Sequence, residues 1–373
     1  MTATTKLFLC GDVMTGRGVD QILPRPGEPH LRERFTRSAL EYVVLAERAH
    51  GPIPRPVEYA YVWGDALEIL EEERPDARLI NLETSVTTSE DAEPGDINYR
   101  MHPGNVPVLS AARIDCCTLA NNHALDWGEE GLRETLDVLE RAGIRTAGAG
   151  RNLAAAQRPA IVGVGDRRRV LVFAFGARDS GVPDAWRARS DKPGLNVLAD
   201  FSRTTVAQVA DAVNAVVRED DIVVASIHWG PNWGYEIPRA HRRFAHDLID
   251  SARVDVVWGH SSHHPKAIEI RAGRPIVYGC GDLLNDYEGI SGYQEYRADL
   301  TLMYFLSLDV ASRRLVELAM RPLRIRNFRL RRAAPDDARW LRQLIDNECA
   351  QFGYRTRLRN DRFELAVKDP RDT

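Results

Sequence analysis

Short apolar runs, each followed at once by polar or glycine residues, recur along the chain and predict its strands. A continuous apolar run of this length, bounded by turn residues, is typical of a strand buried on both faces. The clearest runs cover residues 6–10, 77–81, 115–120, 221–227 and 254–258. Because polar residues follow each run, we expect them at the carboxyl ends of the strands.

Helical periodicity fills several of the segments between these strands. Apolar residues share one face over 129–142, 201–218 and 239–252, which predicts three amphipathic helices. Gly143 follows the first of them as a typical helix stop. Strands that alternate with helices favour a layered α/β architecture with the functional loops at one edge of the sheets.

Two segments do not follow this alternation of strands and helices. Residues 22–65 contain six prolines and predict an insertion packed over the functional loops. Residues 333–373 carry one amphipathic helical pattern and a strand candidate at 362–367. We therefore expect one domain over 1–332 and a helix-strand extension of that domain over 333–373.

Composition narrows the classes of function. Fifty basic and 54 acidic residues give the 373-residue chain a net charge of −4, which removes the electrostatic reason to expect a nucleic-acid or membrane-surface protein. The apolar run near the N-terminus is too short for a signal sequence or a membrane span. Five cysteines without a CxxC pair favour free thiols, so we expect a cytoplasmic protein.

The polar residues after the strands form a set that suits a metal. Carboxylate, amide and imidazole groups together favour Zn²⁺, Mn²⁺ or Fe²⁺ over Ca²⁺, which prefers oxygen alone. Each residue taken singly also has a local explanation, such as a turn, a helix cap or a packed ring. Their recurrence at several strand ends favours a shared site of one or two ions, with these candidates: Asp12, Glu83, Asn122, His228, His260 and His263.

Six motifs together give the chain a family resemblance. They are GDVMTGR (11–17), NLETSV (81–86), LANNHALDWG (119–128), IHWGPNWGYE (227–236), GHSSHHPKAIE (259–269) and YGCGDLLND (278–286). The set resembles the CapA, or poly-γ-glutamate and capsule biosynthesis, family within the calcineurin-like metallophosphoesterase superfamily. This resemblance covers roughly residues 5–325. It implies a metallophosphoesterase-like four-layer α/β/β/α sandwich, in which two packed mixed sheets are flanked by helices.

The resemblance also implies how the metal ligands divide. Asp12 and His263 would hold a first metal, Glu83 would bridge both metals, and Asn122, His228 and His260 would hold the second. The superfamily places a histidine two residues after the first aspartate, whereas this chain has Met14. Because a thioether is a poor ligand for such ions, we expect the first site to lack one ligand.

Other residues of the motifs are candidates for catalysis, for substrate binding and for support of the ligands. His123 is placed to protonate a leaving group, and Asp126 is placed to orient His123, to bind metal or to cap the next helix. Four cationic residues would form an anion-binding rim or simply serve as surface charges and salt bridges: Arg17, Arg100, His264 and Lys266. Asp282, Asn285 and Asp286 are expected to support the site from behind the ligands.

The sequence thus predicts a soluble metal-dependent hydrolase for an anionic small molecule or polymer, with either a phosphoester or a γ-glutamyl-type amide as the scissile bond. The alternative is a non-catalytic accessory protein that binds a polyanion or a synthase partner. The sequence leaves the oligomeric state open.

Overall fold

The computed structural model describes residues 3–95, 97–165, 168–359 and 361–367. Its larger sheet is mixed, since β1 runs antiparallel to β17 and parallel to β3. The main strand order is β16 (Asp282–Leu284), β2 (Asp12–Val13), β3 (Ala77–Leu82), β1 (Thr4–Leu9), β17 (Leu300–Asp309), β18 (Leu315–Ile325), β21 (Arg362–Val367) and β20 (Tyr354–Arg359). Off this path, β6 (Cys116–Thr118) pairs with β3 and β7 (Arg145–Ala147), and β19 (Leu330–Arg332) pairs with β18.

The smaller sheet is parallel at its centre and antiparallel at both edges. Its order is β14 (Ile268–Arg271), β15 (Arg274–Val277), β13 (Val256–His260), β12 (Ile222–His228), β10 (Arg168–Gly176) and β9 (Ala160–Val164). Two short pairs lie outside both sheets: β4 (Ser85–Val86) with β5 (Arg100–Met101), and β8 (Ala149–Gly150) with β11 (Gly194–Leu195).

The alternation of side chains along each strand builds four layers. In β1, Leu7 and Leu9 face the core between the sheets, whereas Phe8 faces the helices on the other side. In β10, Val170 faces the same central core and Leu171 faces the opposite helical layer. The four-layer α/β/β/α sandwich implied by the family resemblance is therefore confirmed.

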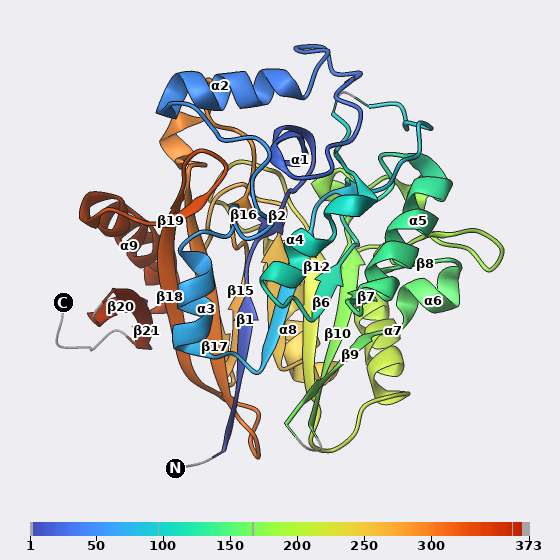
Figure 1. Cartoon of the computed structure of the whole chain (residues 1–373). Helices are drawn as coiled ribbons and strands as arrows, with labels where there is room; N and C mark the ends of the chain where they lie inside the picture. The colour runs from blue at the N-terminus through green and yellow to red at the C-terminus, as the bar shows by residue number, and fades with distance from the viewer. Residues whose placement is uncertain (1–2, 96, 166–167, 360, 368–373) are drawn as a thin grey trace.

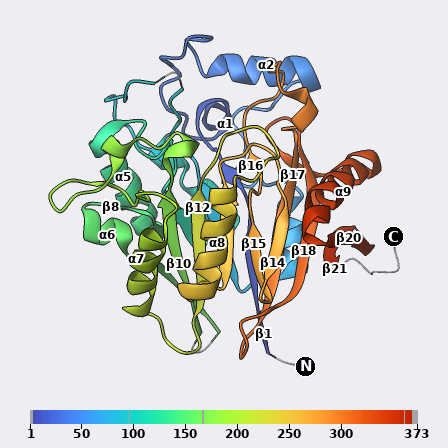
Figure 2. The ribbon, with the colours of Figure 1, turned by 180° about the vertical axis from the view of Figure 1, so that it is seen from behind.

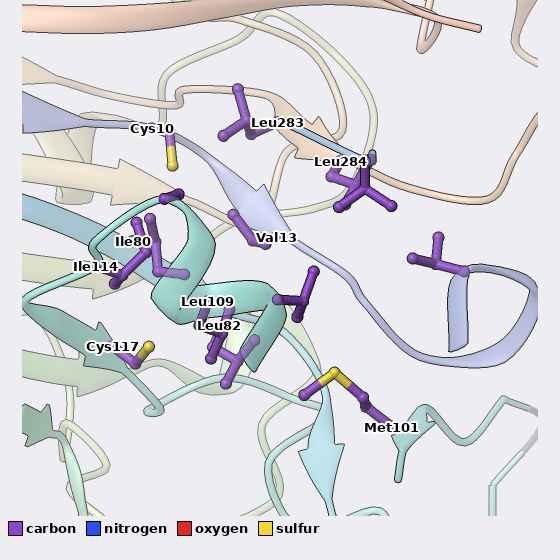
Figure 3. Packing of buried hydrophobic residues seen from close by; sticks show 14 of the residues in the cluster. Cys10, Val13, Ile80, Leu82, Met101, Leu109, Ile114, Cys117, Leu283 and Leu284 are labelled. Carbon is purple, nitrogen blue, oxygen red and sulfur yellow. The ribbon is translucent and has the colours of Figure 1, made fainter. Parts of the chain in front are cut away.

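Helices cover the outer faces of both sheets (Figures 1 and 2). The first layer holds α3 (Ala66–Glu73), α4 (Pro107–Ala111) and α5 (Gly128–Arg141), and the opposite layer holds α7 (Arg203–Asn214) and α8 (Arg239–Ser251). Leu109 of α4 and Leu82 of β3 belong to one buried apolar cluster, part of which Figure 3 shows. This cluster packs α4 against the strands that lead to the functional loops.

Two more helices lie at the end of the sandwich where β2 and β16 are found. They are α1 (Arg17–Ile22) and α2 (Leu40–His50), which contact each other. The short helix α6 (Leu153–Gln157) packs beside β8. Residues 22–65 thus contribute α2 to a cover above this sheet edge.

The predicted elements are found with small shifts at their ends. The strands expected at 77–81 and 221–227 are β3 and β12, and the helix expected at 239–252 is α8. At the C-terminal end, α9 (Pro335–Cys349) contacts β14 and β18, so it packs along the edge of the central core. No helix among the described residues combines the length and apolarity needed to cross a membrane.

Candidate metal centre

Two neighbouring parallel strands end in histidines that face each other. His228 closes β12 and His260 closes β13, and the strand register pairs the two residues directly. Their Nδ1 atoms lie 2.8 Å apart, and the second ring nitrogen of His260 lies 2.7 Å from Ser226 Oγ. Both rings are buried. The parallel register therefore brings two imidazole nitrogens to one point at the edge of the sheet.

The larger sheet brings carboxylates to the same place. Asp12 stands in β2 opposite Asn81 of β3 and opposite Asp282 of β16. The amide of Asn81 donates to Asp12 Oδ1 at 2.6 Å, and the backbone N–H of Ser261 donates to Asp12 Oδ2 at 3.1 Å. Asp12 is 1% exposed, so these bonds hold its carboxylate in one orientation away from water.

The ligand-capable atoms form two groups that share Asp12. Within each group the atoms lie within 4.8 Å of one another, and every residue is buried. Glu83 also approaches the first group, with Oε1 3.7 Å from His228 Nε2. The first group is Asp12, His228 and His260, and the second is Asp12, Glu83, His263 and Asp282. The first group thus contains the two histidines predicted for the second metal, and the second group contains Asp12 and His263, which are predicted for the first metal.

Asn122 and His123 follow β6. Asn122 Oδ1 lies 2.8 Å from His228 Nε2, so the Asn122 side chain reaches the first group, and its role as a metal ligand stays a prediction. Asn121 is buried and donates to Asn81 Oδ1 at 3.1 Å and to the carbonyl of Leu82 at 2.9 Å. These bonds tie the loop after β6 to the end of β3.

The electrostatics of the two groups favour a divalent cation. Burial, reinforced by Asp282, raises the pKa of Asp12 to about 7. Burial and the nearby Asp12 carboxylate raise the pKa of Glu83 well above its usual range. Burial also lowers the pKa of His228 and brings that of His260 to about 3. Neutral imidazoles bind metals, and a cation stabilises crowded carboxylates as anions.

Glu83 adds a further buried carboxylate to the centre. Glu83 is 2% exposed, and its Oε1 lies 3.7 Å from His228 Nε2. An ionised carboxylate at a buried position is costly unless cations or hydrogen bonds stabilise its charge. The donor set of oxygen and nitrogen atoms suits Mn²⁺, Zn²⁺ or Fe²⁺.

His123 and Asp126 form a pair beside the centre. His123 Nδ1 lies 2.7 Å from Asp126 Oδ2, which also accepts a hydrogen bond from the Tyr99 N–H at 2.6 Å. The Tyr99 ring lies against the His123 ring, with 4.0 Å between their centroids. The carboxylate of Asp126 therefore orients His123, and makes no cap to α5, where Trp127 occupies the N-cap position.

The residues of the predicted cationic rim contact other groups of the protein. Arg17 is buried, and its guanidinium binds Asp286, Glu33 and the Tyr42 hydroxyl. Arg100 donates to the carbonyl of Ser89 at 2.8 Å, and its guanidinium lies 3.9 Å from the centre of the Trp127 ring. The role of either arginine in substrate binding stays a prediction.

The two remaining cationic candidates are also buried. The His264 ring stacks on Tyr296, and burial lowers its pKa to about 4. Lys266 donates to the carbonyl of Glu236 at 3.1 Å, and burial lowers its pKa. Arg17, His264 and Lys266 are thus buried and Arg100 is half-buried. This burial depends on long-range packing, which the motifs do not show, and an anion-binding role of the four residues stays a prediction.

Asp282 lies closer to the ligands than the sequence predicts. The motif predicts a supporting position behind the ligands, whereas the structure places Asp282 inside the second group. The available signal was its position inside the last motif, directly after Gly281 and at the start of a short strand.

Comparison with known proteins now identifies the family. The family described as "Bacterial capsule synthesis protein PGA_cap" matches residues 6–287, a span that contains every candidate ligand. The chain belongs to this family. A curated relative in Mycobacterium tuberculosis, named "Probable polyglutamine synthesis accessory protein", is 51% identical over 95% of this chain and 94% of its own length.

More distant members and a solved structure complete the comparison. The "PGA biosynthesis protein CapA" of Bacillus subtilis is 26% identical over 81% of this chain and 68% of its own length. A solved structure described as a novel phosphatase from Mycoplasma pneumoniae aligns over 86% of this chain and 94% of its own, with 10% identity and a TM-score of 0.45. That likeness is too low to carry a conclusion about activity. This PGA_cap chain thus combines a capsule-synthesis family with a buried Asp and His cluster compatible with divalent metal.

Proposed function

We propose that this PGA_cap chain is a cytoplasmic, divalent-metal-dependent hydrolase of capsule or poly-γ-glutamate biosynthesis. Its substrate is anionic and carries a phosphoester or a γ-glutamyl-type amide. The observation that carries the proposal is the pair of buried ligand groups sharing Asp12, with the His123–Asp126 pair beside them. A protein that only binds a polymer has no need to bury this many ionisable groups together.

The chain's own residues divide the work in this proposal. When bound, divalent ions would activate water for attack and neutralise charge on the attacked group. Asp12 and His263 would hold one ion, and Asn122, His228 and His260 would hold the other. Glu83 keeps its predicted bridging role, supported by its approach to both groups.

His123 would supply the proton to the leaving group. Its side chain is 12% exposed, so it lies between the buried ligands and solvent. Because Asp126 contacts Nδ1, the other ring nitrogen is free to face the substrate. Protonation by a positioned imidazole favours departure of an alkoxide or an amine alike, so both scissile bonds stay in the proposal.

A second candidate is a non-catalytic accessory protein that binds a polyanion or a synthase partner. The name of the mycobacterial relative favours it, as does Met14 in place of a histidine ligand. Under this hypothesis the metal centre would stabilise the fold, and substitution of His123 would leave polymer binding unchanged.

Turnover by metal-loaded protein separates the two candidates. We expect Mn²⁺- or Zn²⁺-loaded chain to hydrolyse an aryl phosphodiester, an aryl phosphomonoester or a γ-glutamyl anilide. His123→Ala should reduce kcat on the active substrate about 10²–10⁴-fold with unchanged metal content by elemental analysis. The control is His246→Ala, which removes a histidine that pairs with Glu269 outside the site.

The possible outcomes are distinct. Equal turnover by the His123 and His246 variants would contradict the catalytic role of His123. A metal-loaded wild-type chain inactive on every substrate, yet able to bind poly-γ-glutamate, would favour the accessory function.

A further inference from the structure

The missing histidine at position 14 leaves open how the first metal would be held. In the structure the backbone N–H of Met14 donates to the Leu284 carbonyl at 2.9 Å, so the segment after Asp12 runs directly beside β16. The neighbouring strand therefore lies where a replacement ligand is needed.

The strand register aims Asp282 at the metal centre. β16 pairs in parallel with β2, and Asp282 stands opposite Asp12. Figure 3 shows Leu283 and Leu284 close to Val13 in this strand pair. Since residues paired across parallel strands point to the same face, the carboxylates of Asp12 and Asp282 share one side of the sheet.

Two glycines make this close pairing possible. A Cβ on Gly11 would lie 1.3 Å from the carbonyl oxygen of Gly281, which is a direct clash with backbone. Gly281 has φ +77°, a conformation that favours glycine. The N–H of Asp12 donates to that same carbonyl at 3.0 Å. The approach of the two segments is thus built into the sequence at both positions.

Hydrogen bonds then hold the Asp282 carboxylate inside the second ligand group. Oδ1 lies 2.8 Å from His263 Nδ1, and Oδ2 accepts from Asn285 Nδ2 at 2.8 Å. Asp282 is 4% exposed. The group contains three carboxylates and one imidazole, an excess of buried negative charge that needs a cation.

We propose that Asp282 is a ligand of the first metal ion and takes the place of the histidine that Met14 replaces, with Asn285 positioning its carboxylate. This inference rests on the proposed function, since it concerns the same metal centre. It gives the first ion four protein ligands, Asp12, Glu83, His263 and Asp282, and removes the expected deficit.

Metal stoichiometry of Asp282→Asn tests the inference without an activity assay. Manganese content by elemental analysis and Mn²⁺ titration by calorimetry should show two ions for wild type. The variant should hold one ion and bind the second at least tenfold more weakly. Asp299→Asn is the control, because it removes the same charge from an ion pair with Arg297 outside the site and should keep two ions.

A misfolded variant is distinguished by thermal unfolding in EDTA. Without metal, Asp282→Asn removes a like charge from the group and also weakens the contact with His263, so these opposing effects should leave a cooperative unfolding transition close to that of metal-free wild type. Loss of that transition would show that the variant is misfolded. Adding Met14→His to Asp282→Asn should restore the second ion.

The failures of the two proposals differ. If the Asp282→Asn variant binds the wild-type number of ions with wild-type affinity, Asp282 is not a metal ligand, and the hydrolase proposal is unaffected. Wild-type chain that binds no Mn²⁺ or Zn²⁺ would overturn both.

Discussion

At the scale of single residues, the centre depends on side chains held in place by neighbours that are not ligands. Asn81 and the Ser261 N–H hold Asp12, Ser226 contacts His260, and Asp126 contacts His123. Such outer contacts fix the orientation of the groups that would bind metal or move protons. Changes to them should alter rates more than folding.

Asp126→Asn is predicted to lower kcat about 10–100-fold with little change in KM. The amide keeps the shape of the carboxylate but loses the negative charge that orients the His123 ring. Steady-state kinetics on the substrate found for wild type provide the measurement. Metal content equal to wild type is the control, and a change confined to KM would contradict the positioning role.

At the scale of elements, short strands that meet edge to edge position the ligands. β12 and β13 bring His228 and His260 together by register, and β2 and β16 do the same for Asp12 and Asp282. The second pairing depends on the absence of a side chain at position 11.

Gly11→Ala is therefore predicted to destabilise the fold and the metal centre together. The added Cβ clashes with the Gly281 carbonyl, and relief requires the strands to separate, at a cost of about 3 kcal/mol or more. Chemical denaturation measures the free energy of unfolding. Gly163→Ala in β9 is the matched control, because nothing lies within 4 Å of its added Cβ, and it should change stability by about 0.5 kcal/mol or less. Equal effects of the two substitutions would argue against the close approach.

At the scale of the whole molecule, the centre joins the two sheets, so metal should stabilise the entire sandwich. Asp12 and Asp282 come from the larger sheet and the two strand-end histidines from the smaller one. An ion held between them adds binding free energy to folding.

Removal of metal is predicted to lower the melting temperature and to make it dependent on pH. The unfolded pKa of an aspartate is about 3.9, whereas the folded metal-free chain has a pKa of about 7 at Asp12. The folded state thus binds the proton more tightly, and the metal-free chain loses stability as pH rises from about 4 to about 7. Metal binding requires the ionised form, so its stabilisation should grow over the same interval.

Thermal unfolding with Mn²⁺ or with EDTA, at pH 5 and pH 8, checks this prediction. The difference between the two conditions should be larger at pH 8. A melting temperature that EDTA leaves unchanged at both values would contradict a structural contribution from metal.

Much of the fold and most of the candidate ligands could be predicted because they depend on local sequence. Apolar runs gave the strands β3 and β12 because burial on both faces requires continuous apolar residues. His228 and His260 could be assigned to strand ends because each directly closes such a run.

The sequence by itself determined the layered α/β class, the family motifs and the placing of polar residues at strand ends. Tertiary structure decided which of those residues meet. It placed Asp282 beside Asp12 and buried Arg17 against Asp286. The physical reason is that periodicity reports local burial, whereas the register of strands far apart in the chain and the pairing of buried charges arise only when the sheets pack.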